Sequence, residues 1–212
     1  MLFDLDGTLS DSLADIAWAL RTARVEMGYA PVTDEEVRGW VGAGAPLLVA
    51  RSLGVPETDP RVAPLLARFL DVYTGALPAD GATLYPGVVE LLDGLRARGV
   101  LVACTTNKPE GPARALLAGL GILDRFDALV TPESAGTRKP DGRFMEAALA
   151  RLGVAAAEAL VVGDGNPDLE AARAAGIRCV AVLGGYGSRD ELLSLEPEFT
   201  VETVSELAGR WT

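Results

Sequence analysis

Histidine is absent from this 212-residue chain, and cysteine occurs only twice. The absence of histidine excludes Ser-His-Asp triads, Cys-His dyads, phosphohistidine chemistry and zinc sites with histidine ligands. Cys104 and Cys179 stand 75 positions apart, each inside an apolar run, which predicts two buried thiols rather than a disulfide. Any chemistry in this protein must therefore rest on other side chains.

Long hydrophobic runs are also missing. The longest uncharged apolar-rich stretch, Gly39–Ala50, has 12 residues and is too short to span a membrane. We see no basic segment followed by an apolar one near the start, so we expect no signal peptide and a cytoplasmic location. Hydrophobic residues make up 49% of the chain and charged residues 23%, which is typical of a globular protein. Together with the length, this composition favours one folded core with an insertion.

Positive charge is scarce, because 19 Lys and Arg residues face 30 Asp and Glu residues, for a net charge of −11. A nucleic-acid-binding protein would normally carry a basic face, and an anionic membrane would repel this surface. We therefore expect neither as a partner. Lysine occurs only at Lys108 and Lys139, against 17 arginines. This bias is either chance or a sign that a compact ammonium matters at those two positions.

Helical and strand patterns alternate from residue 86 onward. We expect helices over Pro86–Arg98, Pro109–Leu120, Gly142–Leu152 and Pro167–Ala175, and strands over Val100–Cys104, Ala128–Val130, Leu160–Gly163 and Cys179–Leu183. Asp141 and Asn166 are the expected N-caps of the last two helices. Apolar strands joined by helices indicate an α/β fold with a Rossmann-like parallel sheet, covered by helices on both faces.

The beginning of the chain departs from this alternation. Met1–Leu5 predicts a short strand, but the next strand is not expected before Val100. Helices are expected instead over Ser12–Met27, Thr33–Trp40, Ala45–Leu53 and Arg61–Tyr73, with Thr33 and Glu36 as a capping box. We therefore predict an α/β core of residues 1–10 and 81–212 and an inserted helical cap of residues 11–80. Its joints, Leu9–Ser12 and Pro78–Gly87, either allow it to hinge over the sheet or hold it as a rigid subdomain.

Two aspartates stand at the end of the first strand. A carboxylate buried in a strand is unfavourable unless it is paired or binds a metal ion. Asp4 and Asp6 are therefore candidates for a nucleophilic carboxylate and an acid/base carboxylate, with Gly7 allowing a sharp turn. The alternative is an ordinary Asp-Gly turn without catalytic function.

Asp164 and Asp168 follow a later strand and enter a helix. They either cap that helix and complement its dipole, or bind a hard cation. Mg²⁺ prefers a few oxygen ligands and keeps several waters. Asp4, Asp164 and the backbone carbonyl of Asp6 are the candidate ligands, and Asp168 would ligate or support them.

Thr106, Asn107 and Lys139 complete the set of candidate residues. Thr106 and Asn107 precede a helix, where a hydroxyl and free backbone N–H groups suit a phosphate. The Lys139 ammonium would hold a phosphate oxygen and relieve the repulsion among the carboxylates, unless it is a solvated lysine at a helix end. Parallel strands place such segments together at the carboxyl edge of the sheet.

The ordered set of DLDGT at 4–8, TTNK at 105–108, RKPD at 138–141 and GDGNPD at 163–168 resembles the haloacid dehalogenase superfamily of phosphohydrolases over essentially the whole chain. The resemblance implies that Asp4 is the nucleophile and Asp6 the general acid/base. It also implies that Thr106 and Lys139 bind phosphoryl oxygens, that Asp164 and Asp168 serve a Mg²⁺ ion, and that the insert is a helical cap. The expected activity is hydrolysis of a small phosphate ester through an aspartyl phosphate.

The cap narrows the choice among relatives. Dehalogenases lack the second aspartate, which is present here as Asp6. Phosphonoacetaldehyde hydrolases need a cap lysine and β-phosphoglucomutases use a cap histidine, and the predicted cap has neither, so a phosphatase remains. The segment Arg38–Ala45 is similar to the cap loop of phosphoglycolate phosphatases, and its Gly42 and Gly44 would let the backbone approach a small ligand, unless they only form a turn between helices. Arg38 would assist there or lie solvated at a helix end. Pyrophosphatases, sugar-phosphate phosphatases and a catalytically idle binding module on the same fold remain alternatives.

Overall fold

The sheet of the computed structural model, which describes residues 1–75 and 81–209, is built from six parallel strands. Their order is β5 (Ala128–Val130), β4 (Ala103–Thr105), β1 (Leu2–Phe3), β6 (Leu160–Gly163), β7 (Arg178–Val182) and β8 (Phe199–Val201). The short β1 lies at the centre, where Leu2 pairs with Ala103 on one side and with Val161 on the other. The strand that leads to Asp4 is therefore the axis of the sheet.

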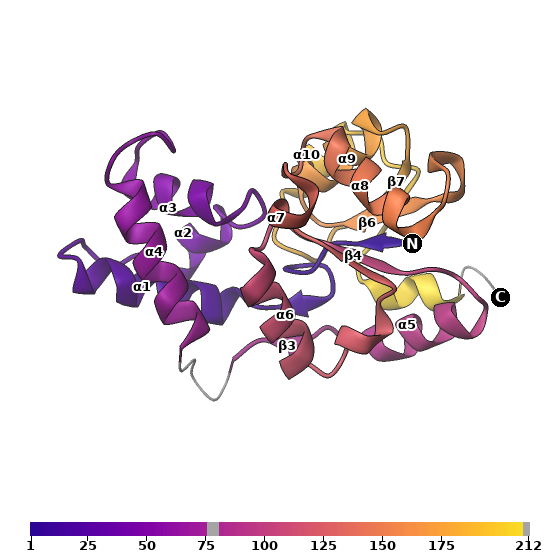
Figure 1. Cartoon of the computed structure of the whole chain (residues 1–212), viewed down its shortest axis with the longest axis horizontal. Coiled ribbons are helices and arrows are strands. Elements are labelled where there is room, and N and C mark those ends of the chain that lie inside the picture. Colours follow the sequence, from indigo (N-terminus) through magenta and orange to yellow (C-terminus); the bar gives the residue numbers. More distant parts are fainter. Residues whose placement is uncertain (76–80, 210–212) are drawn as a thin grey trace.

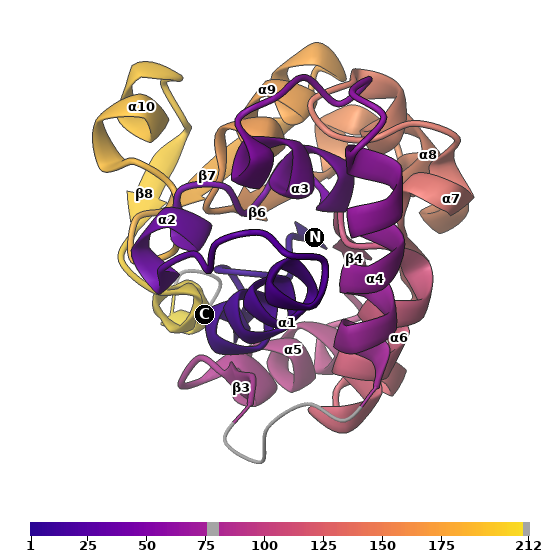
Figure 2. The same ribbon diagram turned by 90° about the vertical axis from the view of Figure 1, so that its left-hand side faces the viewer.

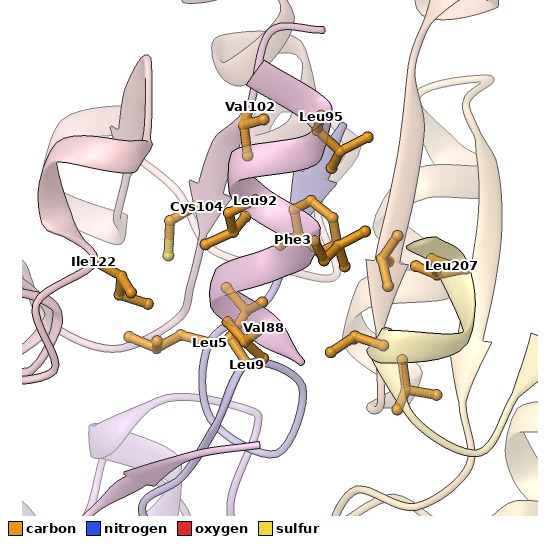
Figure 3. Packing of buried hydrophobic residues seen from close by; sticks show 14 of the residues in the cluster. Phe3, Leu5, Leu9, Val88, Leu92, Leu95, Val102, Cys104, Ile122 and Leu207 are labelled. Atoms are coloured by element: carbon orange, nitrogen blue, oxygen red, sulfur yellow. The ribbon is translucent and has the colours of Figure 1, made fainter. Parts of the chain in front are cut away.

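Helices cover both faces of the sheet (Figure 1). One face packs against α5 (Val88–Ala97), α6 (Glu110–Gly119) and the 3-10 helix η3 (Val204–Gly209); the other packs against α8 (Gly142–Leu152), α9 (Asn166–Ala174) and α10 (Arg189–Ser194). Successive side chains of a strand point to opposite faces of the sheet. Phe3 therefore packs in the first hydrophobic cluster (Figure 3) and Leu2 in the second. The predicted α/β, Rossmann-like fold is confirmed.

The insert is a group of four helices with a hydrophobic cluster of its own. They are α1 (Leu13–Glu26), α2 (Asp34–Arg38), α3 (Ala45–Leu53) and α4 (Val62–Thr74). The capping box of Thr33 and Glu36 at the start of α2 is confirmed. Figure 1 shows this helical module beside the sheet, and Figure 2 shows it in front of the strands.

Short elements between the predicted ones were not anticipated. The two connections to the helical module pair with each other, because β2 (Ser10–Asp11) runs antiparallel to β3 (Thr83–Leu84). Strand β8, α7 (Pro132–Ala135), α10 and the 3-10 helices η1 (Leu123–Arg125), η2 (Ala156–Glu158) and η3 were also missed. Residues 78–80 of the predicted second joint lie outside the described residues.

One predicted cap was wrong and another is confirmed. Asn166 is the first residue of α9, and the N-cap is Gly165. The Gly165 N–H donates to the Asp168 carboxylate at 3.1 Å, which fixes the start of the helix one residue earlier than predicted. Asp141 caps α8 as expected.

Both cysteines are free and buried, as predicted. Within the described residues, no helix has the length and apolar character that crossing a membrane requires.

Two leucines test the packing on the helical layers. Leu92 in α5 is fully buried against β1 and β4 (Figure 3), whereas Leu193 in α10 is 45% exposed. Leu92→Ala should lower the free energy of unfolding by about 2–5 kcal/mol, because it leaves a cavity. The matched control Leu193→Ala should change it by less than about 0.5 kcal/mol. Urea denaturation followed by circular dichroism measures both, and equal losses would contradict the assigned core.

Candidate active site

The predicted functional residues meet at the carboxyl edge of the sheet. Asp4 follows β1, Thr106 follows β4 and Asp164 follows β6, while Lys139 lies in the loop between α7 and α8. Backbone hydrogen bonds extend the strand pairing to this edge, with Asp4 N–H donating to Val162 O at 2.9 Å. The topology therefore brings together groups that are far apart in the sequence.

Lys139 is the centre of the cluster. Its ammonium donates to Asp4 Oδ1 at 2.7 Å, to Asp168 Oδ1 at 2.5 Å and to the backbone carbonyl of Thr105 at 2.7 Å. The residue is 1% exposed, so the alternative of a solvated lysine at a helix end is wrong. Because all three N–H donors are used, the ammonium is fixed against Asp4.

Asp164 is held from two sides by groups that sequence reasoning missed. Thr8 Oγ1 donates to Asp164 Oδ1 at 2.5 Å, and the Tyr186 N–H donates to Asp164 Oδ2 at 2.8 Å. Gly7, with φ of +92°, passes so close that a Cβ there would lie 2.2 Å from Asp164 Oδ2. The run of glycines around Tyr186, directly after β7, was the available signal for this loop.

The electrostatics of the cluster favour a cation. Oxygens of Asp4, Asp164 and Asp168 lie within 4.8 Å of one another, all buried, with one ammonium among them. Burial, and next the Asp168 carboxylate, raises the pKa of Asp4 well above its usual value and that of Asp164 to about 7. Burial alone would lower the pKa of Lys139, but Asp168 and Asp4 outweigh it and raise that pKa. Hard oxygen donors with excess negative charge suit Mg²⁺.

Asp6 is held separately by Lys108. The Lys108 ammonium contacts Asp6 Oδ1 at 3.0 Å and Oδ2 at 3.1 Å, and Ser12 Oγ donates to Asp6 Oδ1 at 2.5 Å. The same ammonium lies 4.5 Å from the centre of the Tyr73 ring in α4. Lys108 was singled out in the sequence by the rarity of lysine, and the structure gives it a partner in the site.

Asn107 connects the two sides of the site. Its Nδ2 donates to Gly42 O of the helical module and to Lys139 O, both at 3.0 Å, and its Oδ1 accepts from Lys139 N–H at 2.9 Å. The side chain is thus engaged inside the protein, which leaves the backbone N–H for the expected contact with a phosphate. Thr106, 1% exposed, accepts from Lys108 N–H at 3.1 Å.

A cavity of about 50 Å³ separates the sheet edge from the helical module. The core contributes Asp4, Asp6, Thr106, Asn107, Lys108, Pro109 and Pro112, and the module contributes Ile16, Val41, Gly42, Gly44, Ala45, Leu48, Phe69, Leu70 and Tyr73. Gly42 and Gly44, with φ of +106° and +95°, therefore face the predicted catalytic residues as expected. One water needs roughly 10–15 Å³ on this scale, so the cavity suits a molecule of few atoms.

Arg38 connects the module to the core outside this cavity. The residue is exposed overall, yet its Nη2 donates to Gly185 O at 2.5 Å and its guanidinium lies 5.3 Å from the centre of the Tyr186 ring. The Tyr186 hydroxyl donates to Asp11 Oδ1 at 2.7 Å and accepts from Ser12 N–H at 2.8 Å. The loop that holds Asp164 is thus tied to the module and to its first connection.

Comparison with known proteins identifies the family. A sequence profile described as haloacid dehalogenase-like hydrolase matches residues 1–182. A phosphoglycolate phosphatase of Rhodospirillum rubrum is 43% identical, covering 100% of this chain and 89% of that protein; one of Cereibacter sphaeroides is 40% identical, covering 88% and 85%. A crystal structure described as a predicted phosphoglycolate phosphatase from Haemophilus somnus superposes with a TM-score of 0.86 at 26% identity, covering 97% and 94%. This chain belongs to the haloacid dehalogenase-like hydrolases.

Proposed function

We propose that this protein hydrolyses small phosphate monoesters with Mg²⁺, and that 2-phosphoglycolate is its substrate. The observation that carries the proposal is the buried Asp4 carboxylate, fixed by Lys139 at the wall of a small cavity. The names of the relatives from Rhodospirillum rubrum and Cereibacter sphaeroides, both phosphoglycolate phosphatases, support the choice of substrate.

Asp4 and Asp6 divide the chemistry between them. Lys139 occupies Asp4 Oδ1, so Oδ2 is the atom that attacks phosphorus and forms the aspartyl phosphate. Asp6 protonates the leaving oxygen and later takes a proton from the attacking water. Thr106 and the backbone N–H of Asn107 hold the phosphoryl oxygens, whose charge increases in the transition state. Lys139, whose three N–H donors are engaged, supports them through its positive charge beside Asp4.

The carboxylate cluster fits a magnesium ion. Asp4 and Asp164, with the backbone carbonyl of Asp6, are the proposed ligands, and Asp168 supports them, because its oxygens already bind Lys139 and the Gly165 N–H. When bound, the ion neutralises charge on the phosphoryl group. Thr8 and the Tyr186 N–H orient Asp164 toward it.

The helical module is proposed to act as a cap of residues 11–80 over a core of residues 1–10 and 81–212. The antiparallel pair of β2 and β3 forms its base, and Gly42 meets the core through Asn107. The apolar wall from this module offers a sugar few hydroxyl partners, which favours a short substrate. A cytoplasmic setting is part of the same proposal, supported by two free, buried cysteines.

Substrate preference tests this proposal first. Among 2-phosphoglycolate, glycerol phosphate, pyrophosphate and glucose 6-phosphate, we expect the highest kcat/KM for 2-phosphoglycolate, because the apolar wall of the cavity offers a sugar few hydroxyl partners. Phosphate release with Mg²⁺ measures each rate. A preference for pyrophosphate or the hexose phosphate would overturn the choice of substrate but not the phosphatase activity, whereas no release from any ester would indicate an idle module.

The two aspartates have different expected losses. Asp4→Asn should abolish turnover, because an amide is a poor nucleophile, while Asp6→Asn should lower kcat about 10²–10⁴-fold through loss of acid/base catalysis. The matched control Asp93→Asn removes a carboxylate that is 55% exposed and pairs with Arg125, and should leave kcat unchanged. Wild-type kcat in Asp4→Asn would rule out the covalent mechanism.

The pKa of Asp164 links stability to pH and Mg²⁺. Because this pKa is raised from 3.8 to about 7 in the folded protein, the metal-free fold holds a proton that the unfolded chain releases, so its stability falls as pH rises between those values. In EDTA, Tm should therefore be a few degrees lower at about pH 8 than at about pH 5.5, and Mg²⁺ should raise Tm most at pH 8.

Asp164→Asn is the control for this measurement. It should reduce both the pH dependence and the Mg²⁺ effect, whereas the general repulsion of an acidic protein would persist. If Mg²⁺ has no effect on the wild-type Tm at pH 8, the metal site is wrong.

A further inference from the structure

Lys108 supplies positive charge at the wall of the cavity, and it is not among the groups proposed to hold the phosphoryl oxygens. Among the described residues that line the cavity, Lys108 is the only one with a positive side chain. Lys139 is beyond reach for a second anion, since its three donors are engaged with Asp4, Asp168 and Thr105. Arg38 binds Gly185 instead. A second negative group on a bound substrate would therefore meet Lys108.

Tyr73 adds an unpartnered hydroxyl next to this ammonium. The residue is 5% exposed, lines the cavity, and its ring lies 4.5 Å from Lys108 Nζ. Within residues 1–75 and 81–209, its buried hydroxyl oxygen has no partner at normal hydrogen-bond distance, and after burial the Lys108 ammonium beside it is the polar group that acts most on its pKa. A buried hydroxyl without such a partner is unfavourable, and a hydrogen-bond acceptor on a ligand in the cavity would relieve this.

The position of Lys108 relates this pair to the leaving group. Its ammonium lies 3.0 Å from Asp6 Oδ1, and Asp6 is the proposed donor of a proton to the leaving oxygen. In an ester of a 2-hydroxy acid, the carboxylate is one carbon away from that oxygen. Because Lys108 contacts Asp6 and lies beside Tyr73, a carboxylate one carbon away from the oxygen that Asp6 protonates would be close to both side chains.

We propose that Lys108 and Tyr73 form the binding site for the leaving group's carboxylate and thereby select phosphate esters of short 2-hydroxy acids. This inference rests on the proposed phosphatase function. The Lys108 ammonium forms a charge-assisted hydrogen bond to one carboxylate oxygen, and the Tyr73 hydroxyl donates to the carboxylate as well. The remaining walls from the helical module, Ile16, Val41, Leu48, Phe69 and Leu70, are apolar, so an uncharged leaving group gains no comparable contact.

A pair of substrates that differ only in this carboxylate tests the inference. Ethyl phosphate has a methyl group where 2-phosphoglycolate has its carboxylate. The readout is the selectivity, defined as the ratio of kcat/KM for 2-phosphoglycolate to that for ethyl phosphate. Because Lys108 also contacts Asp6, a variant at Lys108 lowers the rates for both substrates, and this shared loss cancels in the ratio.

We expect Lys108→Met to lower the selectivity about 10- to 100-fold and Tyr73→Phe to lower it about 2- to 10-fold, in line with charged and neutral hydrogen bonds. Lys108→Arg should retain part of it. The control Arg68→Gln removes a half-exposed cation from the same helix as Tyr73, outside the cavity, and should leave the ratio unchanged. Glycolate should inhibit ethyl phosphate hydrolysis competitively, and more weakly in Tyr73→Phe.

The outcomes separate the two proposals. If Lys108→Met and Tyr73→Phe lower both rates equally, so that the ratio stays within twofold of wild type, the carboxylate site is wrong and the phosphatase function stands. An equal loss of selectivity in Arg68→Gln would also overturn the carboxylate site, because the effect would then come from the electrostatic field of the whole protein. If the wild type hydrolyses neither ester, the proposed function fails, and the carboxylate site fails with it.

Discussion

Three buried carboxylates share one buried ammonium at the carboxyl edge of the sheet, and the rest of the site is arranged around this imbalance. Asp4, Asp164 and Asp168 cannot all ionise beside Lys139 without leaving excess negative charge in a desolvated place. The raised pKa values of Asp4 and Asp164 are the direct consequence. A bound cation would compensate the excess negative charge more completely than protonation, because it keeps Asp4 ionised, which the proposed mechanism requires.

Glycines stand at the positions where a side chain would collide with these carboxylates. A Cβ at Gly163 would lie 2.4 Å from Asp168 Cγ, and one at Gly185 would lie 2.3 Å from Asp164 Cβ. At Gly187 it would lie 1.9 Å from the backbone oxygen of Asp164. Glycines at the end of β6 and in the loop after β7 thus make room for the cluster, which links the sequence composition of these two segments to the electrostatics of the site.

The sequence was sufficient for elements with strong local signals. The helix Ala45–Leu53 and the strand Leu160–Gly163 have the predicted bounds, since apolar periodicity and flanking glycines define them locally. The pair of β2 and β3 and the edge strand β8 escaped prediction because each has two or three residues and forms through distant partners. Asp4 and Lys139 were identified through motifs, whereas the role of Tyr186 depends on a loop 22 residues beyond Asp164.

Contacts between residues far apart in the sequence also connect the two sides of the cavity. Asn107 follows the core strand β4, yet its amide binds Gly42 of the helical module and both backbone groups of Lys139. A single side chain therefore sets the position of the module's loop relative to the ammonium that fixes Asp4. On the other side, Arg38 reaches the loop that orients Asp164. Because both contacts end next to groups of the carboxylate cluster, any movement of the helical module changes the surroundings of these carboxylates, which makes the size of the cavity and the geometry of the cluster interdependent.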